Sequence, residues 1–163
     1  MAQGDLVQRM LGAATLNIDT YEEVEADETA TMQAGTVVAM VAVASAIGAI
    51  GTGGTSIIFA PIAAIVGWLA WAGVTYLIGD KLLGGTATWG ELLRTLGFAQ
   101  APGVLYVLGI IPFLGGMVGF GVWIWMMVAG VIAIRQALDF STGKAILTAV
   151  LGIIPMVILF SII

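Results

Sequence analysis

The sequence of 163 residues contains neither cysteine nor histidine. Their absence excludes disulfides, metal sites built on thiolate or imidazole, haem ligation by histidine and Cys–His nucleophilic catalysis. Charge is scarce as well, since 9% of the residues are charged against about a quarter in an ordinary soluble domain. The apolar segments have no ionisable residue in their middles, where proton pumps and ion-coupled carriers usually keep one. We therefore expect no catalytic residues, no metal ion and no cofactor.

Apolar sequence is abundant: 60% of the chain is hydrophobic, and its mean hydropathy is +1.10. It falls into five spans, at about residues 34–50, 57–78, 98–111, 117–137 and 144–163. A helix of about 20 residues crosses a hydrocarbon core of about 30 Å. The pattern predicts an all-α integral membrane bundle of five transmembrane helices. It also predicts two parts, a cytoplasmic N-terminal segment at 1–33 and a five-span domain at 34–163.

The third span is the weakest of the five. Residues 98–111 are too few to cross alone at 1.5 Å per residue. The span reaches full length only if a helix from Trp89, begun by a capping box of Thr88 and Glu91, continues into it. Pro102 and Gly103 favour a kink or a break. A kinked continuous helix and a broken, partly re-entrant one both remain open.

The charged residues predict the orientation. The connections near residues 51–55 and 112–116 carry no charge, and the other two connections carry Lys81, Arg94, Arg135 and Lys144. Bases gather on the cytoplasmic side of membranes. We therefore expect the N-terminus in the cytoplasm and the C-terminus outside. No basic patch is present, so nucleic acid is not expected as a partner.

The N-terminal segment predicts two helices. Residues 5–16 place apolar side chains at helical spacing, which predicts a short amphipathic helix on the membrane surface or on the bundle. A second helix is expected from Tyr21, capped by Thr20 and Glu23 or by Asp19. No proline lies within residues 21–50, which favours a continuation of this helix into the first span.

An acidic block is the sharpest local feature of the chain. It consists of Tyr21, Glu22, Glu23, Glu25, Asp27 and Glu28. Like charges three and four residues apart oppose a helix unless something neutralises them. Three interpretations remain open. The block is a solvated helix start, it holds a divalent cation, or it docks onto a basic partner or onto the chain's own Arg94, Arg135 and Lys144.

Polar residues near the ends of the third and fourth spans form a second candidate site. Arg94 follows Glu91 by three residues and Arg135 precedes Asp139 by four, which favours local ion pairs. The alternative is a cytoplasmic pocket for a lipid headgroup or a partner's carboxylate, in which the side chains of Arg94, Gln100, Arg135 and Gln136 converge.

The fourth span also carries two packing patterns. Gly115 and Gly119 form a GxxxG pair, which predicts close packing between helices. The aromatic and methionine cluster at residues 123–127 is interpreted as packing and lipid contact rather than as a cofactor site.

Three segments carry a resemblance. Residues 19–34, 90–102 and 134–139 are similar, in this order, to bacterial members of the Yip family, the Ypt/Rab-interacting-protein domain proteins. The resemblance implies five spans, a cytoplasmic N-terminus and, for a bacterial member, the cytoplasmic membrane. Eukaryotic relatives bind Rab GTPases in vesicle traffic. This chain lacks their Asp-Leu-Tyr-Gly-Pro type of motif and has a short tail, so a Rab-type GTPase is not the expected partner.

We expect a non-enzymatic membrane scaffold or adaptor whose cytoplasmic face associates with other membrane proteins, with a second copy or with membrane lipid. Reversing the charges of Glu22, Glu23 and Glu25 should then abolish partner capture and leave insertion intact. The alternatives are a small channel or carrier for an uncharged or lipidic solute, and a structural subunit of a larger membrane complex.

Overall fold

The computed structural model describes residues 5–50, 60–111 and 114–162, and every regular element in them is a helix. In chain order these are α1 (Leu6–Ala14), α2 (Ile18–Ala26), α3 (Ala30–Gly48), α4 (Ala60–Tyr76), the π-helix η2 (Leu77–Leu82), α5 (Trp89–Phe98), the 3₁₀-helix η3 (Ala101–Ile110), α6 (Leu114–Ala137) and α7 (Thr142–Ile162).

Five helical stretches are long and apolar enough to cross a membrane. They are Ala30–Gly48, Ile62–Leu82, Trp89–Ile110, Leu114–Ala137 and Thr142–Leu159. Together with the short helix α1, they confirm the predicted all-α membrane bundle. The predicted uncharged turns at 51–55 and 112–116 fall wholly or partly outside the described residues, and α6 already begins at Leu114.

Helix α1 has two distinct faces. Arg9 and Ala13 are buried against the rest of the protein, whereas Val7 and Leu11, one turn apart, are 57% and 62% exposed. An exposed apolar stripe beside an apolar bundle is suited to the membrane surface. Both predicted settings of this helix, on the bundle and on the membrane surface, are therefore compatible with its two faces.

The predicted start of the second helix is wrong by three residues. Helix α2 begins at Ile18, and the side chain of Asn17 caps it by accepting a hydrogen bond from the backbone N–H of Thr20 at 3.3 Å. Asparagine is among the strongest N-cap residues, and its side chain replaces the partner that the first N–H groups lack. Asn17 therefore takes the role predicted for Thr20 and Glu23.

The predicted continuation of this helix into the first span is also wrong. Helix α2 ends at Ala26, and Asp27 has an extended backbone with φ −90° and ψ 98°. The Asp27 carboxylate accepts hydrogen bonds from the Thr29 N–H at 2.9 Å and from its hydroxyl at 2.6 Å. An aspartate that bonds its own backbone two residues on competes with the helix. The chain consequently turns at residues 27–29 before α3 begins.

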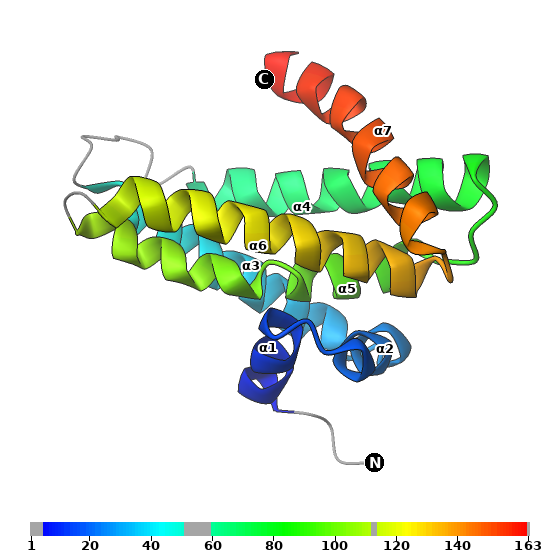
Figure 1. The fold of residues 1–163 in the computed structure, drawn as a ribbon, viewed down its shortest axis with the longest axis horizontal. Coiled ribbons are helices and arrows are strands. Elements are labelled where there is room, and N and C mark those ends of the chain that lie inside the picture. The colour runs from blue at the N-terminus through cyan, green and yellow to red at the C-terminus, as the bar shows by residue number, and fades with distance from the viewer. Residues whose placement is uncertain (1–4, 51–59, 112–113, 163) are drawn as a thin grey trace.

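The third span is a continuous path made of two helix types. The predicted capping box of Thr88 and Glu91 starts α5, which passes through Ala99 and Gln100 into η3 (Figure 1). Pro102 lacks an N–H and its ring would clash with an α-helical carbonyl four residues back, so the helix changes type there. Ten α-helical and ten 3₁₀ residues span roughly 35 Å, enough to cross a bilayer core.

The second span extends further than predicted. Helix α4 passes directly into η2, so this span ends at Leu82 rather than near residue 78. Asp80 and Lys81 therefore lie on helical backbone, paired with each other at 2.6 Å. The connection to α5 is correspondingly shorter.

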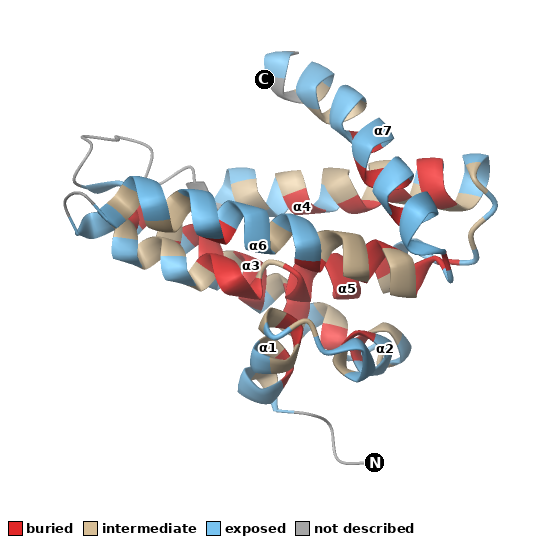
Figure 2. Ribbon diagram, in the orientation of Figure 1, coloured by how far each residue is buried: buried red, intermediate tan, exposed pale blue. Residues whose placement is uncertain are grey.

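Small residues bring the helices into close contact. A Cβ added at Gly48 on α3 would overlap the Tyr106 carbonyl of η3, and one added at Gly97 on α5 would lie 2.7 Å from the Ala34 Cβ of α3. Ala34, Val37 and Val38 are fully buried, and Figure 2 shows buried residues concentrated along α3 and α5. The small residues of α3 therefore pack closely against α5 and η3.

Helix α7 stands apart from the other spans. It starts just after the end of α6, where the Ser141 hydroxyl accepts a hydrogen bond from the Lys144 N–H at 3.4 Å, and it contains Pro155. Figure 1 shows it diverging from the bundle toward its C-terminus. Its outer half therefore leaves the faces of α4 and α6 uncovered.

Candidate functional site

The polar residues of the protein gather where α2 lies against the ends of α5 and α6. We call this surface the polar face, and it contains Glu22, Glu25, Arg94, Gln136 and Asp139. Helices α1 and α2 lie across the spans on one side of the bundle (Figure 1).

Arg9 fastens the N-terminal helices to the first span. Its guanidinium is 2% exposed and pairs with Glu23 at 2.9 Å and with Asp27 at 2.6 Å. It also donates to the Gln33 Oε1 at 2.8 Å. Burial lowers the pKa of Arg9, but the hydrogen bonds and charges of Asp27 and Glu23 outweigh this and raise it. Arg9 thus joins α1, the α2 region and α3.

Arg94 holds the C-terminal end of α2. The guanidinium is buried, and its Nε donates to the backbone carbonyls of Val24 and Glu25, each at 3.0 Å, while Nη2 also donates to Glu25. The last carbonyls of a helix lack intrahelical partners and carry partial negative charge, so a cation there is stabilising. The expected ion pair with Glu91 is not formed. The Glu91 carboxylate accepts from the Thr88 N–H instead.

Tyr21, counted with the acidic block from the sequence, is a packing residue. Its side chain is fully buried and its hydroxyl donates to the Ala13 carbonyl at 3.1 Å. Glycine at position 12 permits this close approach, because a Cβ there would overlap the Thr20 hydroxyl. Tyr21 therefore holds α2 against α1.

The end of α6 supplies two further members of the polar face. Gln136 donates from Nε2 to the Glu22 carboxylate at 3.0 Å, and Asp139 accepts from the Thr86 hydroxyl at 2.7 Å. Asp139 has φ 53°, a left-handed conformation that aspartate tolerates at a helix C-terminus. The Arg135 side chain forms no hydrogen bond or ion pair within the described residues, including the expected pair with Asp139.

The acidic block was predicted to dock onto the chain's own bases, and only some of these bases bind it. Arg94 binds the block through backbone carbonyls, and Arg9, which sequence reasoning missed, binds two of its carboxylates. Lys144 donates instead to the Leu83 carbonyl at 3.3 Å. The sequence feature that could have identified Arg9 is its position as the single base among the acids of the first 35 residues.

Glu25 is the electrostatically perturbed member of the polar face. Burial raises its pKa from 4.5 to about 7, and the charges of Glu91, Asp139 and Glu22 act in the same direction against that of Arg94. Its carboxyl group therefore changes charge near neutral pH. The exposed Glu28 differs, since its carboxylate has no partner among the described residues.

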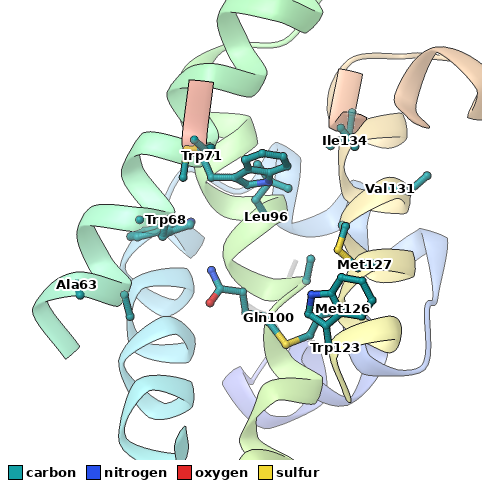
Figure 3. A pocket seen from close by; sticks show the side chains of 16 residues that line it. Ala63, Trp68, Trp71, Leu96, Gln100, Trp123, Met126, Met127, Val131 and Ile134 are labelled. Carbon is teal, nitrogen blue, oxygen red and sulfur yellow. The ribbon is translucent and has the colours of Figure 1, made fainter. Parts of the chain in front are cut away.

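Gln100 does not join the polar face but lines a cavity inside the bundle. The cavity has a volume of about 540 Å³ and is bounded by α4, α5, α6 and α7. Figure 3 shows the Gln100 carboxamide extending between α4 and α6, with Trp68 and Trp71 on one side and Trp123 and Met126 on the other. The sequence interpretation of residues 123–127 as packing and lipid contact did not foresee this cavity, because its walls come from four separate helices.

The two glycines of the predicted GxxxG pair have different surroundings. A Cβ at Gly115 would lie 3.0 Å from the Gly109 carbonyl of η3, whereas one at Gly119 would meet nothing within 4 Å. Gly115 therefore sits at a close helix contact. Packing of Gly119 against a second chain stays a prediction.

The geometry defines an integral membrane protein of five helical spans with N-terminal helices docked at a polar face. A family model, the Yip1 domain, matches residues 19–163 and so covers α2 and all five spans. The chain belongs to the Yip1 domain family, which confirms the resemblance found in the sequence. No curated protein and no solved structure matches it.

Proposed function

We propose that the protein is a non-enzymatic membrane scaffold that associates with other membrane proteins through the polar face and through the exposed acids of α2 and of the turn that follows it, Glu28 included. The observation that carries this proposal is the attachment of α2 to the bundle by two buried arginines, Arg9 and Arg94. Both arginines bind the C-terminal half of α2 or the residue that follows it, and a helix fixed in this way presents its outer side chains in a defined arrangement, which lowers the entropic cost of binding a partner.

The orientation and the membrane belong to the same proposal. With the bases on the cytoplasmic side, the polar face lies in the cytoplasm and the C-terminus outside, in a bacterial cytoplasmic membrane. The division into a cytoplasmic segment at 1–33 and a membrane domain at 34–163 stays a prediction, and the nearest helix break lies at residues 27–29.

Charge reversal at Glu28 tests the scaffold. The combined reversal of Glu22, Glu23 and Glu25 is a poor test, because Glu23 binds the buried Arg9 and its loss would also release α2. Glu28 is exposed and its carboxylate has no internal partner among the described residues. We expect Glu28→Lys to lower photocrosslinking of the full-length protein to its dominant membrane partner by about tenfold, the scale of a well-placed charged contact.

The crosslinking residue is placed at the exposed Ala26, and yields are compared in native membranes. Asp5→Lys is the matched control, since it makes the same charge change at an exposed acid without a side-chain cap bond. The control should retain the wild-type yield. Equal yields for wild type and Glu28→Lys, or an equal loss in both variants, would refute recognition by this surface.

A further inference from the structure

The cavity between α4, α5, α6 and α7 has the size of a ligand site. Its volume of about 540 Å³ lies within the range of about 300–1,000 Å³ found for small-molecule sites. The residues that line it include no charged side chain, and α7 contributes only Ala149 and Met156 to its wall. Helix α7, which forms this part of the wall, diverges from the bundle toward its C-terminus (Figure 1).

One polar group inside the cavity lacks a partner. The Gln100 carboxamide forms no hydrogen bond within the described part of the chain. The indole N–H of Trp68 beside it is already bonded to the Leu93 carbonyl at 3.0 Å. An amide left unpaired in an apolar environment is unfavourable, so a bound oxygen atom that pairs with it would be stabilised there.

We propose that this cavity binds a neutral lipid that carries a hydroxyl or carbonyl oxygen, and that Gln100 hydrogen-bonds this oxygen. A carboxamide both donates and accepts, so it can bind either group. The aromatic and thioether side chains of Trp71, Trp123 and Met126 form the apolar walls for the hydrocarbon part.

The depth of Gln100 excludes a lipid headgroup as the bound group. Gln100 lies near the middle of the span Trp89–Ile110, about 16 Å from its polar end at 1.5 Å per residue. Charged headgroups stay at the surface of a core that is about 30 Å thick. A neutral lipid can enter the core and reach this depth.

The volume of the cavity is too small for a partner helix. A helix about 10 Å wide would fill 540 Å³ with about 7 Å of its length, little more than one turn, so the cavity does not accommodate a partner helix. A flexible hydrocarbon chain fits both the volume and the mostly apolar lining of the cavity.

Photolabelling tests the site in the full-length protein in lipid vesicles. The two probes are a long-chain alcohol with a diazirine in its chain and the alkane of equal length without the hydroxyl. We expect the alcohol to label wild-type α4 and α6 about fivefold to tenfold more than the alkane does, the scale of one hydrogen bond.

Three variants separate the contributions of shape and hydrogen bonding. Gly130 lines the cavity and a Cβ there meets nothing within 4 Å, so Gly130→Leu should fill the space and lower labelling by both probes at least fivefold. Gly121→Leu, also on α6 and also without a close neighbour but outside the cavity, should leave both unchanged. Gln100→Leu should lower labelling by the alcohol alone.

The outcomes decide between a site and general lipid contact. Unchanged labelling in Gly130→Leu, or equal losses in Gly130→Leu and Gly121→Leu, overturns the cavity as the site. Equal labelling of wild type by the two probes, or no effect of Gln100→Leu on the alcohol, overturns the hydrogen bond. The predicted pattern in all three variants supports the proposal, and none of these outcomes depends on the polar face.

Discussion

Arg94 illustrates why an arginine suits the end of a helix in this protein. Its planar guanidinium donates to two successive carbonyls of α2 at once, from a buried position. A lysine ammonium is a compact point charge that is more strongly hydrated, so it replaces such a group poorly. Sequence spacing pointed to an ion pair with Glu91, but the acceptors lie on a different helix.

Glu25 makes the docking of α2 depend on pH. Its pKa in the folded protein, about 7, lies above its ordinary value of 4.5. The protonated form therefore favours the docked helix. This stability is fully present below about pH 4.5 and is lost as the pH rises through 7. Because the carboxyl group is partly exposed, we expect the loss to be on the order of 1 kcal/mol.

Hydrogen exchange of the α2 amides measures this effect. The ratio of exchange rates between wild type and Glu25→Gln should rise about fivefold from pH 5.5 to pH 8.5, since the intrinsic pH dependence cancels in the ratio. A ratio that stays constant over this range would show that Glu25 does not control docking.

At the scale of elements, glycine and alanine set the distance between α5 and α3. A Cβ at Gly97 would lie 2.7 Å from the Ala34 Cβ and 3.2 Å from the Trp68 Nε1. Helices in membranes associate through such close contacts, because lipid provides no hydrophobic force between them. The spacing of these two helices therefore depends on a single missing methyl group.

Gly97→Ala should destabilise the folded protein by about 1–3 kcal/mol, the usual effect of overpacking. Denaturant unfolding in micelles measures it, with Gly121→Ala as the control because that position has open space. Adding Ala34→Gly to Gly97→Ala should restore part of the loss. A purely additive double mutant would show that the two residues do not meet.

The helix type of the third span changes at one residue, Pro102, and the changed part also contacts a neighbouring helix. Pro102 ends the α-helical pattern, and the Gly103 N–H bonds back to the Gln100 carbonyl at 2.7 Å. Gly103 also lies against α3, since a Cβ there would be 2.5 Å from a Val41 methyl group. The ten residues of the 3₁₀-helix η3 therefore include both Pro102 and a close contact with α3.

At the scale of the whole molecule, the charged connections lie at one end of the spans. This arrangement predicts a single orientation of the chain in the membrane. Because the chain contains no cysteine, single cysteines report orientation without background. Gly143→Cys places a thiol at the charged end, and Gly116→Cys and Ser161→Cys place thiols near the uncharged end and the C-terminus, all at exposed positions.

A membrane-impermeant maleimide should label Gly116→Cys and Ser161→Cys in intact cells, and Gly143→Cys only after the membrane is opened. Labelling of Gly143→Cys in intact cells would reverse the proposed orientation. Labelling of Gly116→Cys and Ser161→Cys from opposite sides would contradict five complete spans.

Composition and local pattern were sufficient for the membrane class, the five spans and the Thr88 capping box, because hydropathy and capping depend on residues close in sequence. The carbonyls bound by Arg94 and the cavity around Gln100 arise only in the folded chain. Each joins residues from separate helices. Periodicity shows that a face is apolar, but the packing of whole helices decides which face meets which, and where space remains between them.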